Sequence, residues 1–220
     1  MKNTVANILL LPVAFTVCLI FFRVFYSGSF MYLFFTWNLF LAAIPLLLSQ
    51  YLIQLKNRKF HWIFFGLWML FFPNAMYIVT DFVHLKERNN IPLWFDVILI
   101  FSAAANGLMM AFISLYRVEL FLLSKFNERK TNFILYGCLF VSSFGVYMGR
   151  FLRWNSWDIF FNPFQFIFEI IQLFVNPFRH PRTWGMTIIF FFFFGIFYFI
   201  IKKLPGLIIK PGKQLLKKIR

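Results

Sequence analysis

Long apolar stretches alternate along the chain with short polar connections, and about six of these stretches are long enough to cross a lipid bilayer. A transmembrane helix needs about 20 predominantly apolar residues. The predicted spans cover approximately residues 5–25, 30–52, 62–82, 93–115, 133–151 and 186–201. Each span has to be helical because lipid offers no hydrogen-bond partner to an exposed backbone amide. The pattern predicts an all-α, polytopic transmembrane helical bundle.

The distribution of lysine and arginine predicts how these spans are oriented. Basic residues gather in the connection after the second span, in the connection after the fourth span and in the tail at residues 202–220. Short connections rich in lysine and arginine stay on the cytoplasmic side of a membrane. We therefore expect a single membrane domain over residues 1–220, with both termini in the cytoplasm. The basic cytoplasmic tail at 202–220 is expected to lie on the anionic inner leaflet.

The segment 157–178 is also apolar, but we do not expect it to form a seventh span. It contains Asp158, Pro163 and Glu169, and a crossing there would export the basic tail. Asn162 and Pro163 together are typical of the start of a helix. The segment is therefore predicted to form a short helix that lies at the outer surface or folds partly inward.

Composition and charge agree with a membrane protein. Hydrophobic residues make up 61% of the 220 positions, which excludes an ordinary soluble fold. The 22 basic and 7 acidic residues give a net charge of +15, which in a soluble protein would suggest nucleic acid. Here the cations flank apolar spans, so no nucleic-acid partner is expected. Cys18 and Cys138 lie inside spans and indicate neither a disulfide nor a metal site.

The third span carries polar residues along one helical face. Asn74, Tyr77, Asp81 and His84 follow one another at steps of three, four and three residues. Pro73 removes a backbone hydrogen bond and is expected to kink the helix and free a carbonyl toward the same side. A polar face inside an apolar span predicts a buried polar contact or a water-filled cavity.

Two further spans place uncommon polar groups at the same membrane end. The fourth span begins near Asp96 and carries Asn106 deeper, and the fifth ends at Arg150 and Arg153, followed by Asp158. Charged groups in a span cost about 2–3 kcal/mol each, so they should face one another or a cavity. We predict an outward-facing polar pocket with one charged cluster and His84 at its rim. The predicted cluster consists of Asp81, Asp96, Arg150 and Arg153.

The fifth span also has a face of small residues. Ser142, Gly145 and Gly149 follow a spacing that lets two helices approach closely. We interpret this face as a packing surface. It would hold Arg150 and Arg153 near the third and fourth spans.

The polar residues of the third to sixth spans resemble the domain-of-unknown-function 1361 family of bacterial integral membrane proteins. The resemblance implies location in a bacterial cytoplasmic membrane and supplies no activity. The residues that carry it are Pro73-Asn74-Ala75, Tyr77, Thr80-Asp81, His84-Leu85, Trp94, Asp96, Asn106-Gly107, Gly149-Arg150 and Arg153-Trp154-Asn155-Ser156-Trp157-Asp158.

The favoured hypothesis is the binding or transport of an anionic small molecule or lipid headgroup. Arg150 and Arg153 would hold the anion by charge-assisted hydrogen bonds, while Asn74, Tyr77 and Asn106 would fix its orientation. The chain shows no inverted repeat of the kind found in self-sufficient transporters, so transport would call for a partner subunit.

Two alternatives remain open. In the first, an outer-leaflet enzyme uses Asp81 and His84 with Asp96 or Asp158 as an acid/base set, or as metal ligands helped by His180, on a lipid-linked substrate. No phosphate loop, paired-histidine motif or nucleophile elbow is visible, so the sequence assigns neither a metal nor a cofactor and leaves enzymatic activity undecided. In the second alternative, the charges only neutralise each other between helices.

Overall fold

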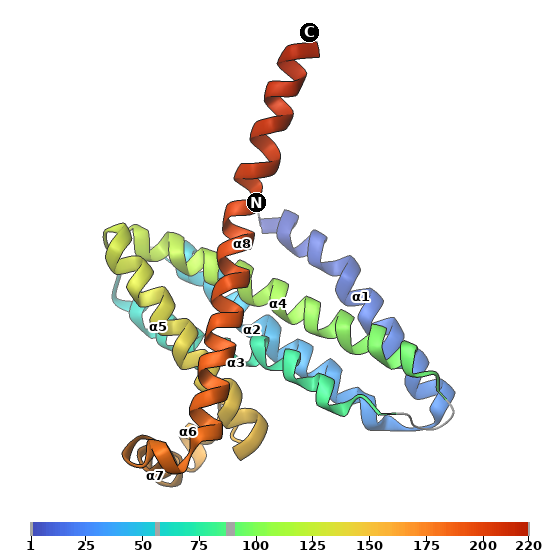
Figure 1. The fold of residues 1–220 in the computed structure, drawn as a ribbon, viewed down its shortest axis with the longest axis vertical. Helices are drawn as coiled ribbons and strands as arrows, with labels where there is room; N and C mark the ends of the chain where they lie inside the picture. The colour runs from blue at the N-terminus through green and yellow to red at the C-terminus, as the bar shows by residue number, and fades with distance from the viewer. Residues whose placement is uncertain (1, 56–57, 87–90, 220) are drawn as a thin grey trace.

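The structure is a bundle of helices, seen in a computed structural model that describes residues 2–55, 58–86 and 91–219 (Figure 1). The described residues form no strand. The α-helices are α1 Lys2–Ser27, α2 Phe34–Gln54, α3 His61–Tyr77, α4 Leu93–Leu123, α5 Glu128–Tyr147, α6 Asp158–Phe161, α7 Pro163–Val175 and α8 Pro181–Ile219. Three of them are extended by short helices of another type. The 3-10 helix η1 Phe30–Leu33 precedes α2, and the 3-10 helix η3 Ile78–His84 follows α3. The π-helical turn η4 Met148–Leu152 follows α5.

Among the described residues, six helical segments are long and apolar enough to cross a membrane, which confirms the predicted polytopic bundle. They are Asn7–Ser27, Phe30–Gln54, His61–His84, Leu93–Leu123, Glu128–Leu152 and Pro181–Leu204. The helices extend beyond several predicted boundaries, most of all at the end of α8, which continues to Ile219, and at the end of α4, which continues to Leu123. A helix can continue past the hydrocarbon core wherever its polar residues face water. The protein is an integral, multi-pass membrane protein.

The segment after α5 forms no seventh span. It folds into the short helices α6 and α7, which lie beside the first turn of α8 in Figure 1. Pro163 occupies the first position of α7, as predicted. Asn162 stands at the N-cap position, but its side chain makes no capping bond; its backbone carbonyl accepts a hydrogen bond from the amide of Phe166 at 3.1 Å.

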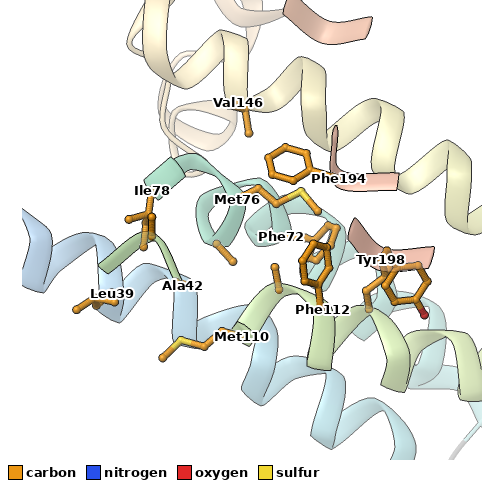
Figure 2. Packing of buried hydrophobic residues seen from close by; sticks show 14 of the residues in the cluster. Leu39, Ala42, Phe72, Met76, Ile78, Met110, Phe112, Val146, Phe194 and Tyr198 are labelled. Atoms are coloured by element: carbon orange, nitrogen blue, oxygen red, sulfur yellow. The ribbon is translucent and has the colours of Figure 1, made fainter. Parts of the chain in front are cut away.

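The helices pack in two connected groups. α2 contacts both α3 and α4, and α1 lies along α4, while α5 packs against α3 and α8 (Figure 1). Aromatic and aliphatic side chains fill the space where these groups meet. Figure 2 shows Met76 of α3, Phe112 of α4, Val146 of α5 and Phe194 of α8 in one apolar cluster.

Glycines allow two of the close helix approaches. A Cβ on Gly107 of α4 would lie 2.7 Å from the backbone oxygen of Ala75 in α3, and one on Gly145 of α5 would lie 2.9 Å from Cγ of Pro73. Larger residues would force the helices apart at both points. The small face predicted on the fifth span is therefore a packing face, and it brings the end of α5 against the end of α3.

Candidate functional site

Asp81 and Arg150 form a buried ion pair at the end of the bundle where η3 and η4 lie, called here the η3 end. Nη2 of Arg150 donates to Oδ1 of Asp81, and Nδ2 of Asn38 in α2 donates to Oδ2 at 2.9 Å. The Asp81 side chain is fully buried. Three elements, α2, η3 and η4, therefore meet at one carboxylate.

The remaining faces of the Arg150 guanidinium are also occupied. Nε donates to Oγ1 of Thr80 at 2.7 Å, Nη1 lies 3.1 Å from Nε2 of His84, and the guanidinium carbon lies 4.4 Å from the centre of the Tyr77 ring. Because a guanidinium can only donate, Nε2 of His84 has to be the acceptor in that bond. The sequence prediction that places Tyr77, Asp81, His84 and Arg150 on one polar surface agrees with this geometry.

Arg153 stands next to this group in an unusual backbone conformation. It follows the π-helical turn with φ 59° and ψ 28°, and it is the one non-glycine residue with positive φ in the described part of the chain. The amide of Trp154 bonds the carbonyl of Met148 at 3.2 Å, closing the helix end in the manner usually built around a glycine. The Arg153 side chain is exposed.

Asp96 requires a correction, because its ion-pair partner is Arg23 of α1. Nε and Nη2 of Arg23 donate to the two carboxylate oxygens at 2.7 and 3.2 Å, and the Tyr32 hydroxyl donates to Oδ2 at 2.8 Å. Both charged side chains are almost fully buried. The predicted cluster is thus divided into two ion pairs, Asp81 with Arg150 and Asp96 with Arg23.

Asn106 also faces α1. Its Nδ2 lies 2.8 Å from Oγ1 of Thr16 and 3.0 Å from the carbonyls of Pro12 and Ser102. Its side chain therefore joins α4 to α1. The expectation that Asn106 orients a ligand beside Arg150 has no support in these contacts.

Asn74 and Asp158 have structural partners in the turn after η4. Nδ2 of Asn74 donates to Oγ of Ser156 at 2.9 Å, and that hydroxyl donates to the carbonyl of Leu70 at 2.9 Å, one turn before Pro73. Asp158 accepts from the backbone amide of Asn155 at 2.6 Å. Asn74 thus fastens this turn to α3, and Asp158 caps it.

A second contact fastens α7 to the same region. The indole Nε1 of Trp154 donates to Glu169 at 2.6 Å, and Trp184 of α8 donates to the carbonyl of Leu173 at 3.3 Å. α7 therefore lies against the turn that carries Arg153. The exposed side of α7 is apolar and includes Phe164 and Phe168.

Sequence reasoning missed the partners that complete the two ion pairs. Arg23 is a lone charge in the first predicted span, and an intramembrane cation requires an acid at the same depth. Asn38 is a polar residue in the second span and could have been included on the same ground. Thr80 and Ser156 carried no such signal, because hydroxyl groups commonly satisfy themselves on their own helix.

The described residues contain no group of three or more His, Cys, Asp or Glu side chains placed to hold a metal ion. Hollows in the described part of the chain lie away from the ion pairs. One of about 270 Å³ lies between α5 and α8, and one of about 220 Å³ lies beside His61 and Lys125.

A family model described as "Protein of unknown function (DUF1361)" matches residues 37–197, well over half of the chain. The chain belongs to this family. The matched region contains Asp81, Asp96, Arg150 and Arg153, whereas Arg23 and Tyr32 precede it. No curated protein matches the chain. No solved structure matches it either.

Proposed function

We propose that this DUF1361 protein binds an anionic group at the η3 end through Arg153, with Arg150 beneath it and His84 at the rim. In the proposed orientation this end faces outward from a bacterial cytoplasmic membrane and both termini lie in the cytoplasm, in accordance with the basic connections at the opposite end. The anion is a phosphate or carboxylate, carried by a small molecule or by a lipid headgroup.

The charge balance at this end supports anion binding. Asp81 is paired with Arg150 and Asp96 with Arg23, while Asp158 and Glu169 accept hydrogen bonds from uncharged donors, the amide of Asn155 and the indole of Trp154. Among the described residues no acidic side chain within ion-pair distance neutralises Arg153. An exposed arginine beside a neutral ion pair attracts anions, and its planar fork fits phosphate and carboxylate.

The backbone of Arg153 carries the proposal. A non-glycine residue in the left-handed region costs about 1 kcal/mol or more, and such residues concentrate at functional sites. π-Helical turns such as η4 are also frequent at functional sites. A purely structural helix end would be more stable with glycine at this position, so the arginine is best explained by what its side chain binds.

The enzymatic alternative has less support. Nε2 of His84 already accepts a bond from Arg150, so this nitrogen is not available as a general base. Asp96 and Asp158 are occupied by Arg23 and by the amide of Asn155. The structural alternative accounts for the Asp81–Arg150 pair but leaves the strained, exposed Arg153 without a role.

The test measures binding of two probes, inorganic phosphate and phosphatidylglycerol, to purified protein in nanodiscs of neutral lipid. Arg153→Gln should weaken binding at least ten-fold, since a hydrogen bond to a charged group contributes about 1.5–3 kcal/mol. Arg179→Gln, an exposed arginine on the same side, is the matched control and should bind as the native protein does. Response to phosphate alone indicates a small-molecule anion, and response to phosphatidylglycerol alone indicates a headgroup. Equal binding by Arg153→Gln and the native protein would refute the proposal.

A further inference from the structure

The hollow between α5 and α8 lies outside the proposed anion site and toward the opposite end of the bundle. Its volume is about 270 Å³ and its walls are almost entirely apolar. The exposed rings of Phe192 and Phe199 border it, so it opens toward the lipid side of the bundle. The residues that line it are Tyr136, Phe191, Phe192, Gly195, Ile196 and Phe199.

Gly195 is the residue that leaves this space open. A Cβ built on it would find its nearest neighbour, Cε1 of Tyr136, at 4.0 Å. An ordinary side chain would therefore fit on the backbone at this position and would occupy the hollow. The hollow depends on one missing side chain, which makes it removable by a single substitution.

Cations lie on both helices beyond the hollow. α5 and α8 run in opposite directions and separate toward the start of α5 (Figure 1), with Phe140 against Phe191 and Tyr136 beside Gly195. A residue one turn nearer the start of α5 therefore lies at the level of a residue one turn nearer the end of α8. Two turns beyond Tyr136 and Gly195, Arg129 and Lys130 of α5 reach the level of Lys203 of α8.

These three cations are exposed, and one of them borders the hollow itself. Nζ of Lys203 lies 6.0 Å from the ring centre of Phe199, which lines the hollow. Lys202 is engaged by Glu119, so it is not counted among them. Glu128 is the acidic residue at the same level, which leaves the group with a net positive charge.

We propose that an anionic phospholipid binds at this place, with one acyl chain in the hollow and its phosphate on Arg129, Lys130 and Lys203. From Arg129 to Tyr136 the helix rises about 10 Å, at about 1.5 Å per residue, which matches the distance from a headgroup to the upper part of its acyl chain. Apolar walls select a chain, and a cationic rim selects an anionic headgroup. A free phosphate would use the rim alone.

The hollow is tested by retention of lipid on the full chain in nanodiscs, with phosphatidylglycerol and phosphatidylcholine of identical acyl chains as probes and native mass spectrometry as the readout. Gly195→Leu should abolish selective retention of phosphatidylglycerol. Gly137→Leu is the matched control: it adds the same side chain to α5, at an exposed glycine with nothing within 4 Å, and should leave retention unchanged.

The cationic rim is tested separately. Replacing Arg129, Lys130 and Lys203 by Gln should weaken phosphatidylglycerol binding about five-fold for each cation removed, and should leave phosphatidylcholine unaffected. Lys125→Gln, an exposed lysine at the same membrane end, is the control. Because the proposed anion site could also hold phosphatidylglycerol, the retention measurements are repeated in an Arg153→Gln background, where the selectivity that remains reports on the hollow alone. This site and the proposed function therefore fail independently.

Three results would overturn the inference. Retention of phosphatidylglycerol that survives Gly195→Leu would show that the hollow holds no chain. Equal retention of the two lipids by the native protein would show that the rim selects no headgroup. Complete displacement of the lipid by inorganic phosphate would identify a phosphate site without a lipid component.

Discussion

Replacing Arg150 by methionine tests the ion pair that joins η3, η4 and α2. Methionine keeps much of the length of the arginine side chain and removes its charge and its donors. The substitution removes the donors to Asp81, Thr80 and His84 and the cation over the Tyr77 ring. Asp81, which is fully buried, would then keep the bond from Asn38, with Nε2 of His84 at 4.0 Å from its Oδ1.

The expected loss of stability is about 3–5 kcal/mol, because removal of one partner leaves an uncompensated buried charge. The pair itself contributes much less than this, since forming it also cost the desolvation of both groups. Removing both charges should therefore restore much of the loss. The double variant Asp81→Asn with Arg150→Met is expected to be more stable than Arg150→Met alone.

The free energy of unfolding can be measured by titration with denaturing detergent in mixed micelles, with the four proteins of the double-mutant cycle side by side. A coupling energy of about 1–3 kcal/mol is expected between the two residues. Arg179→Met, a loss of an exposed arginine, is the control and should change stability by less than about 0.5 kcal/mol. A cost of under about 1 kcal/mol for Arg150→Met, or additive effects across the cycle, would refute the reasoning.

Three further predictions rest on single positions in the structure, and a fourth rests on the proposed topology. Arg153→Gly should raise stability by about 1 kcal/mol, by relieving the left-handed backbone, while abolishing anion binding; a loss of stability would show that its side chain is structural. Gly107→Ala should lower the free energy of unfolding by about 1–3 kcal/mol, because the added methyl group would press on the Ala75 carbonyl. Gly66→Ala, whose added methyl group would meet nothing within 4 Å, should raise it by up to about 1 kcal/mol; thermal unfolding measures both. Arg23→Met should destabilise by several kcal/mol by stranding Asp96, a loss that Asp96→Asn should partly restore in the same assay. In a protein whose own cysteines are replaced by alanine, a cysteine at position 127 should resist impermeant reagents applied outside, and one at position 180 should react. The reverse pattern would invert the proposed topology.

The number of helices, and which of them span the membrane, could be predicted from the sequence because both depend on local properties of the chain. A run of about 20 apolar residues has one stable arrangement in a bilayer, and it requires no knowledge of its neighbours. The same holds for the short helix after η4, where Asp158, Pro163 and Glu169 exclude a span. Periodicity also gave the polar face of the third span, and Tyr77, Asp81 and His84 do lie around one guanidinium.

The pairing of charges was decided only by tertiary structure. Asp81 and Asp96 look alike in the sequence, and two arginines at the end of the fifth span made a single cluster plausible. Packing of α1 along α4 brings Arg23 to Asp96, and close approach of Gly145 to Pro73 brings Arg150 to Asp81. An ion pair forms over a few ångströms, whereas sequence spacing fixes only the face and the approximate depth of a side chain. The left-handed backbone of Arg153 could not be predicted from spacing either, because it follows from how the helix end closes, with the amide of Trp154 bonded to the carbonyl of Met148.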